Sequence, residues 1–253
     1  KNTWNLGGKL AASNRFNYLP DNKTQTGFSH ELHFGKTSGR FNFNVSQERT
    51  DTKYSSDDMG YFTNNNFLTH SGWAGYSWTE PKNWYNRIFL NFNGSYSALS
   101  KKIAPIEDKY QSARLNTNIN IQSKKLWWIG SHLDYSFRQN DFYEPRNEGW
   151  YFKRGASVGI GSWFQSNDSK KYSHSTEVFM RSSINFYNSF AFDVTAMHSM
   201  RFNNKLSLSQ SISLQPRFNN MGYTYVEGSS NINFAKRKVN TIEHTLSAKY
   251  NFT

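Results

Sequence analysis

The chain has 253 residues, no Cys, and 30 Lys and Arg against 18 Asp and Glu, which gives a formal net charge of +12. Aromatic residues make up 17% of it, which is too many for a disordered chain, and no apolar run reaches the roughly 18 residues that a membrane helix requires. The basic residues are scattered singly, without a helix or stripe that carries them, so the composition predicts no nucleic-acid partner.

The composition instead favours a transmembrane β-barrel. A mean hydropathy of -0.81 is compatible with membrane insertion when only every second strand residue meets lipid. The aromatic residues interleave with Asn and Ser instead of clustering apart. The lack of Cys agrees with a compartment outside the reducing cytosol. Because Lys1 opens the chain and no apolar signal region follows, we expect a processed chain or part of a longer one.

Alternation of apolar and polar residues predicts about twelve strands. The first covers residues 3–19, and the next four are centred on 28–34, 41–45, 68–78 and 88–98. Turn residues separate them, and the longest connection among these, 50–65, is polar. All five Pro lie in connections or at strand ends, where a missing N–H costs nothing.

The clearest pattern is a long hairpin over residues 113–138. Leu115, Ile119 and Ile121 alternate with Asn116, Asn118, Asn120 and Gln122, and a polar turn follows at 123–125. Beyond that turn, Ile129 and Leu133 alternate with His132 and Asp134. Each strand therefore has one apolar and one polar face, and each is long enough to cross a bilayer when tilted.

The remaining strands are predicted at 152–164, 172–184, 190–196, 206–214 and 239–252, with loops at 140–149 and 217–231. Several short connections alternate with longer ones, as in outer-membrane barrels with short periplasmic turns and long external loops. This topology places the loops 50–65 and 217–231 at one end and the turns 123–125 and 166–171 at the other. It also predicts an interfacial belt of Trp near the short turns, made of Trp4, Trp78, Trp84, Trp127, Trp128 and Trp163.

The sequence contains no catalytic, metal or cofactor signature. Seven His are dispersed without metal spacing, and no phosphate-binding Gly loop or paired carboxylates occur, so we expect no enzyme activity and no cofactor. Residues at polar positions of the strands are predicted to line a lumen, where they either tune solute passage or simply form ion pairs: Arg114, Asn116, Asn118, Asn120, Asp134, Arg138, Glu177 and Arg181. The basic clusters in the connections are expected either to be solvated by water or to contact anionic lipid headgroups or glycans.

Two segments resemble one another and open longer connections. They are Asp58, Met59, Gly60 and Tyr61, and, later in the chain, Met221, Gly222 and Tyr223 preceded by two Asn. A Gly beside Asn or Asp suits a tight turn with positive φ. We expect a loop motif that is structural or, as the alternative, one that binds a ligand.

The first of these segments, with 64–67, 141–146 (Asp-Phe-Tyr-Glu-Pro-Arg) and 239–242 (Val-Asn-Thr-Ile), resembles the barrel of a Bacteroidota outer-membrane family. Its members carry an N-terminal family-9-type carbohydrate-binding-like domain ahead of a barrel of unknown function. The resemblance covers the chain from about residue 50 and implies no catalytic or binding residues. It implies that 1–253 is a partial barrel without a second domain, so further strands are expected between the first and last strands.

Together these features predict an all-β, antiparallel transmembrane barrel in a bacterial outer membrane. We expect a porin-like channel or surface-exposed component, associated with glycan handling or with a larger outer-membrane complex. Its partners are expected to be membrane lipid, and other outer-membrane proteins or glycans. Three alternatives remain open: the barrel of a TonB-dependent, SusC-like transporter, a soluble extracellular carbohydrate-binding β-sandwich, and an outer-membrane barrel hydrolase.

Overall fold

The structure is a computed structural model that describes residues 3–20, 23–57, 60, 64–147, 149–227 and 231–252. Strands account for most of these residues, and none of them forms an α-helix. Consequently no helix in the described part of the chain is suited to cross a membrane. The prediction of an all-β protein is confirmed.

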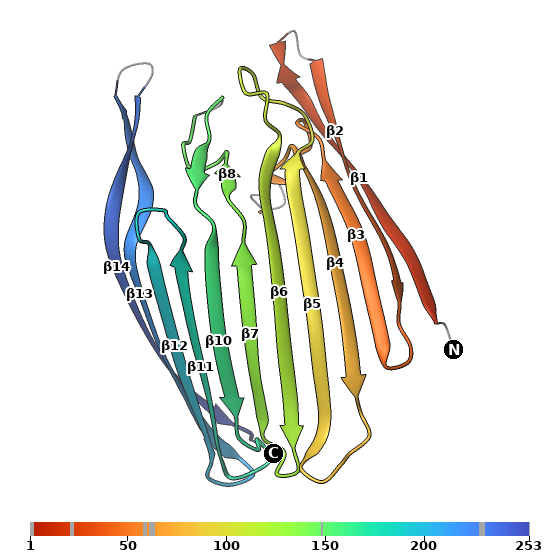
Figure 1. Cartoon of the computed structure of the whole chain (residues 1–253), viewed down its shortest axis with the longest axis vertical. Helices are drawn as coiled ribbons and strands as arrows, with labels where there is room; N and C mark the ends of the chain where they lie inside the picture. The colour runs from red at the N-terminus through yellow and green to blue at the C-terminus, as the bar shows by residue number, and fades with distance from the viewer. Residues whose placement is uncertain are drawn as a thin grey trace. The chain divides into compact units, whose positions relative to one another are not determined.

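Twelve strands form one antiparallel sheet in the order β1-β2-β3-β4-β5-β6-β7-β10-β11-β12-β13-β14, and β8 and β9 form a separate pair (Figure 1). Among the described residues β1 pairs only with β2 and β14 only with β13, so the sheet is not closed. The strands are β1 Trp4–Leu19, β2 Lys23–Lys36, β3 Phe41–Thr50, β4 Phe67–Trp78, β5 Tyr85–Leu99, β6 Tyr110–Ser123, β7 Trp128–Ser136, β8 Gln139–Asp141, β9 Phe152–Arg154, β10 Ser157–Gln165, β11 Tyr172–Ser183, β12 Phe190–Arg201, β13 Leu206–Glu227 and β14 Asn231–Tyr250.

The chain divides into two compact units. Unit 1 comprises Lys1–Gly75, Phe92–Leu115 and Phe137–Arg154, and unit 2 comprises Tyr76–Asn91, Asn116–Ser136 and Gly155–Thr253. Unit 1 holds β1 to β3, β8, β9 and the long connections. Unit 2 holds β7, β10 to β14 and the short turns at 79–84, 124–127 and 166–171.

Alternation along the strands gives the sheet two unlike faces. On β7, Leu133 is 48% exposed and the next residue, Asp134, is 2% exposed. In β6, Leu115 and Ile119 are exposed, whereas Gln122 is buried on the other face. We call the two sides the apolar face and the polar face. The expected separation of the two sets of residues onto opposite faces is therefore seen within these strands.

The small hydrophobic core of unit 1 lies at the end of β5 and in the connection between β8 and β9. Leu99 is 2% exposed at the end of β5, Ala98 beside it and Phe142 are buried, and Pro145 is fully buried. Asn66 binds the connection after β5 through both atoms of its amide, donating to the Lys101 carbonyl (2.9 Å) and accepting from the Lys101 N–H (2.7 Å). Loops that bury backbone in this way require such side-chain partners.

The strand predicted over 152–164 is interrupted. β9 ends at Arg154 and β10 begins at Ser157. A Cβ at Gly155 would lie 2.2 Å from the Cβ of Phe186, so the backbone passes too close to Phe186 for any larger residue. The predicted loop 140–149 is also partly wrong, because Asn140 and Asp141 belong to β8, which pairs with β9.

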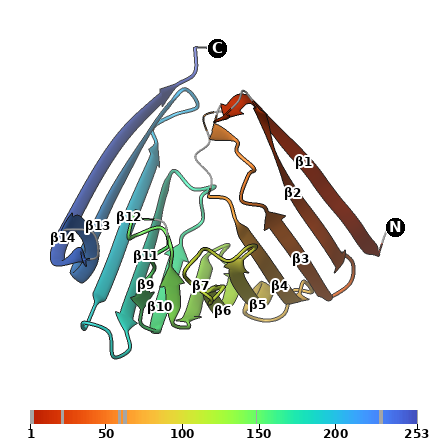
Figure 2. The ribbon, with the colours of Figure 1, turned by 90° about the horizontal axis from the view of Figure 1, so that it is seen from above.

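The loop predicted over 217–231 is wrong for most of its length. β13 continues to Glu227, β14 starts at Asn231, and the two run side by side (Figure 2). Their pairing shifts register between Arg217 and Asn220, where Asn219 has a positive φ of 53°. A bulge of this kind disrupts the alternation of side chains without ending the strand, which is why the sequence pattern fades there.

Candidate functional site

The candidate site lies on the polar face of unit 2, where side chains from β5, β6, β7, β10 and β11 meet. Four side-chain amides form its first row. Asn91 donates to the Oδ1 of Asn118 (2.9 Å), and so does Asn120 (2.9 Å). Asn118 in turn donates to Asn116 (3.4 Å), whose own amide donates to the Leu133 carbonyl (3.4 Å). Amides can bridge in this way because each has both donors and acceptors.

Strand glycines make room for large rings on this face. A Cβ at Gly130 would lie 2.1 Å from the Nε1 of Trp163, and one at Gly161 would lie 2.3 Å from the His132 ring. A Cβ at Gly159 would lie 2.7 Å from the ring of Phe179. Each glycine thus lets a ring from the neighbouring strand cross over the backbone, as expected where a strand lacks a side chain.

Phe89, Trp128 and Trp163, which we call the aromatic row, stack across three strands. Ring centroids are 6.2 Å apart between Phe89 and Trp128, with planes 23° apart, and 6.4 Å between Trp128 and Trp163, with planes 29° apart. The guanidinium of Arg87 lies 5.8 Å from the Trp128 ring and donates to the Gln122 Oε1 (3.0 Å). The row is therefore a ring surface bordered by a cation and an amide.

A charged cluster lies beside the row. The buried carboxylate of Asp134 is 3.8 Å from the Nε2 of His132 and 3.8 Å from a terminal nitrogen of Arg181. His132 stacks on Phe179 with centroids 5.2 Å apart, and the Arg181 guanidinium lies 5.2 Å from the same ring. Aromatic contact and the nearby carboxylate together fix the positions of the His132 ring and the Arg181 guanidinium.

Five of the predicted lumen residues lie in this site. Asn116, Asn118 and Asn120 belong to the row of amides, and Asp134 and Arg181 belong to the charged cluster. Glu177 lies on β11 opposite Trp163 and shares the polar face with Arg181. Arg114 occupies an exposed position of β6 in unit 1. Arg138 lies beyond the end of β7, where its carbonyl accepts the Tyr110 hydroxyl (2.5 Å).

The predicted tryptophan belt separates into two groups by face. Trp78, Trp84 and Trp127 lie at or next to the short turns of unit 2. Trp128 and Trp163 are also near strand ends, but their rings lie on the polar face, in the aromatic row. Trp4, in unit 1, stacks on Phe34 with centroids 5.6 Å apart.

Distance from the turns assigns Trp128 and Trp163 to the belt, whereas the structure places their rings on the polar face. Trp128 is separated from Asp134 by an even number of positions, and Phe89 from Asn91 by two, so both alternate onto the polar face. That parity was the available signal for the aromatic row. Phe89 carried no other mark in the sequence.

The two similar loop segments differ in structure. Gly60 has a positive φ of 78°, whereas Asp58, Met59 and Tyr61 lie outside the described residues. Met221, Gly222 and Tyr223 lie within β13 instead of in a turn, because the hairpin extends further than expected. Gly222 lies under the side chain of Arg237, whose terminal nitrogen would be 2.1 Å from a Cβ there.

The segment 141–146 is an ordered corner of unit 1. The Asp141 carboxylate accepts the backbone N–H groups of Tyr143 and Glu144 (3.0 Å each). Arg154 of β9 donates to Asp141 (3.0 Å) and Glu144 (3.2 Å). Burial raises the pKa of the Tyr143 hydroxyl above its usual value. These contacts explain the residue types of the segment by structure alone.

Within the described residues no group of three or more His, Cys, Asp or Glu is arranged to hold a metal ion. The model of one protein family matches residues 1–253, and that family is described as a domain of unknown function (DUF5916). Neither the curated proteins nor the solved structures contain a match to the chain.

Proposed function

This chain belongs to the DUF5916 family, and from that premise we propose that it is the membrane-spanning sheet of a bacterial outer-membrane β-barrel. In this proposal the apolar face meets lipid and the polar face lines a passage for hydrophilic solutes. The observation that carries it is the inverted burial of adjacent residues, with Leu133 48% exposed and Asp134 2% exposed.

The inversion argues against a soluble sandwich. Two packed sheets bury their apolar faces against each other, whereas here Leu115, Ile129, Leu133 and Ile160 are all exposed. On the other face, Asp134 is buried and Asn118 is hydrogen-bonded to its neighbours instead. A lipid environment satisfies both faces, because it covers apolar side chains and leaves the polar ones to one another and to water.

Strand lengths support the same proposal. β7 and β10 have 9 residues each, and β11 has 12. A tilted strand crosses the hydrocarbon core with about 9–11 residues. Each of these strands is thus long enough to span a bilayer, and an antiparallel sheet satisfies every backbone group except those at its edges.

We further propose that the solutes include saccharides bound along the aromatic row. The C–H face of a sugar ring is apolar and matches an aromatic surface, while its hydroxyls require donors and acceptors at the rim. Trp128 and Trp163 supply the surface, and Arg87, Gln122 and Glu177 border it. The resemblance to a family that carries a carbohydrate-binding-like domain supports the same ligand class.

The test is to place an arginine on each face. Leu133→Arg is expected to reduce the free energy of unfolding by about 2–4 kcal/mol in lipid vesicles, because the charge enters the hydrocarbon. Asn118→Arg, on the polar face of the adjacent strand, is the matched control. It loses the amide contacts of Asn118 but keeps its charge among polar groups and water, so it is expected to cost less than Leu133→Arg. Urea unfolding in vesicles measures both. Equal costs, or a chain that stays monodisperse without detergent, would contradict the membrane assignment.

A further inference from the structure

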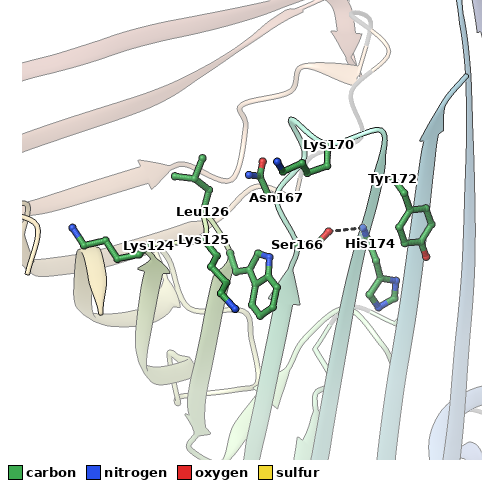
Figure 3. A pocket seen from close by; sticks show the side chains of 9 residues that line it. Lys124, Lys125, Leu126, Ser166, Asn167, Lys170, Tyr172 and His174 are labelled. Carbon is green, nitrogen blue, oxygen red and sulfur yellow. Dashed lines mark hydrogen bonds between the residues drawn. The ribbon is translucent and has the colours of Figure 1, made fainter. Parts of the chain in front are cut away.

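A cavity of about 540 Å³ lies at the turn end of unit 2. It forms where the turn between β6 and β7 meets the turn between β10 and β11, which lie side by side because Trp128 pairs with Gln165. Its lining includes Lys124, Lys125, Trp127, Lys170, Tyr172 and His174 (Figure 3).

Three lysines give this cavity a positive charge. None of them forms an ion pair with a residue that the structure describes. The ammonium group of Lys125 lies 5.2 Å from the centroid of the Trp127 ring, an arrangement that holds the cation by its attraction to the ring face. Asp168 is the single acidic residue of the turn 166–171, and it does not line the cavity.

The cavity floor is held by hydrogen bonds between Ser166 and His174. The Ser166 N–H donates to the His174 carbonyl at 2.8 Å. The His174 N–H donates to the Ser166 hydroxyl, also at 2.8 Å (Figure 3). The His174 ring also forms hydrogen bonds with two side chains: its Nδ1 lies 3.3 Å from the Nδ1 of His198, and its Nε2 lies 2.6 Å from the Thr176 hydroxyl. The imidazole is therefore positioned, with its partners fixed, before any ligand arrives.

The cavity belongs to the apolar face. Tyr172 and His174 alternate with Ser173 and Ser175 and share the side of β11 that carries Met180. Trp127 shares the side that carries Ile129 and Leu133, and its ring contacts Phe164 edge-on at 5.7 Å. Moving from the turns into the strands, a ligand would meet cations first, amphipathic rings next and then aliphatic side chains.

We propose that this cavity binds the phosphate group of an anionic glycerophospholipid. The order of groups along the cavity matches that lipid from headgroup to acyl chain: lysines attract the phosphate, Trp and Tyr suit the interfacial layer, and the apolar strands suit the acyl chains. The acyl-chain part rests on the proposed membrane function. The phosphate part does not, since it depends only on the lysines and on donors already placed around them.

The test measures binding of dioctanoyl-phosphatidylglycerol to the full chain in detergent by native mass spectrometry. Lys124→Gln with Lys170→Gln is expected to weaken binding about thirtyfold, because each lysine at a membrane surface contributes about fivefold. Lys82→Gln with Lys205→Gln is the matched control. It removes two exposed charges from two other turns of unit 2, 79–84 and 202–205, and is expected to leave binding unchanged.

Inorganic phosphate and dioctanoylglycerol separate the two parts of the ligand. Neither alone is expected to bind as tightly as the lipid. Tight binding of inorganic phosphate that depends on Lys124 and Lys170 would show that the ligand of the cavity is a free anion and not a lipid, and would overturn the proposal. Equal losses in the two variant pairs would also overturn it, since they would show nonspecific charge attraction. A chain that is soluble without detergent yet binds the lipid through these lysines would refute the membrane function and leave the phosphate site standing.

Discussion

Gly130 is the residue on which the aromatic row depends most directly. A Cβ at this position would lie 2.1 Å from the Nε1 and 2.5 Å from the Cε2 of Trp163, and 2.8 Å from the Oδ1 of Asn120. Normal contact between heavy atoms is about 3.5–4.0 Å, so the indole has to move by more than 1 Å in Gly130→Ala. This movement separates it from Trp128, with which it now stacks.

We expect Gly130→Ala to reduce the free energy of unfolding by about 1–3 kcal/mol, the usual cost of overpacking. It is also expected to weaken oligosaccharide binding at the row. Gly72→Ala is the control, since a Cβ at Gly72 meets no atom within 4 Å and its φ is not positive. Urea titration in detergent gives the stabilities, and titration calorimetry with a linear oligosaccharide gives the affinities.

A second substitution distinguishes a clash from a general effect of strand glycines. Trp163→Ala removes the atoms that the new Cβ would strike, so the double variant Gly130→Ala/Trp163→Ala is expected to lose less stability than the sum of the two single variants. Additive losses would show that Gly130 does not act through Trp163. A loss in Gly72→Ala equal to that in Gly130→Ala would refute the reasoning altogether.

Two further substitutions test buried polar groups. Arg181→Met leaves the Asp134 carboxylate buried without the guanidinium that lies 3.8 Å away. The attraction between the two charges is at most about 4 kcal/mol at an effective dielectric constant of 20, so we expect the free energy of unfolding to fall by about 2–3 kcal/mol. Adding Asp134→Asn is expected to restore part of this stability, and a double variant as unstable as Arg181→Met would contradict the pairing. Asn66→Ala leaves the Lys101 N–H and carbonyl without the side-chain amide. We expect it to lower the free energy of unfolding, measured by urea titration, by about 2–4 kcal/mol. A loss below about 0.5 kcal/mol would show that water replaces the amide.

Alternation of residue types predicted the strands and their facing well, because the period of two is a local property. Leu133 and Asp134 are neighbours in the sequence, and their opposite faces follow directly from strand geometry. The same rule fails for the predicted loop 217–231, since the bulge near Asn219 shifts the register and mixes the faces. Local pattern cannot show that two strands continue to pair through such an irregularity.

The sites required knowledge of which strands are neighbours. Lys124 and Lys170 line the same cavity because β7 pairs with β10. The two strands between them in the sequence, β8 and β9, form a separate pair outside the main sheet. The sequence marked both lysines as parts of turns but did not show that these turns are adjacent. Likewise, stacking of Phe89 on Trp128 depends on two strands separated by β6. Such arrangements arise from topology and are not encoded in residue spacing.

The connection between β3 and β4 is tied to β2 of unit 1 through the Asp51 carboxylate. The Asp51 carboxylate accepts the backbone N–H groups of Phe28 (2.9 Å), Lys53 (2.8 Å) and Tyr54 (2.8 Å). The segment is thereby held on β2 where Gly27 leaves room, since a Cβ there would lie 2.1 Å from the Tyr54 nitrogen.

Asp51→Ala removes the acceptor of all three N–H groups, and hydrogen bonds to a charged group contribute about 1.5–3 kcal/mol each. Because this exceeds the usual stability of a surface loop, the segment 52–57 is expected to detach, with faster amide hydrogen exchange there and larger solute conductance in planar bilayers. Asp57→Ala is the matched control: it removes the same charge from the same connection, but its carboxylate accepts no hydrogen bond from a described residue. Fast exchange without a change in conductance would show that the segment covers the polar face without limiting passage along it, and equal exchange in the two variants would show that Asp51 does not hold it.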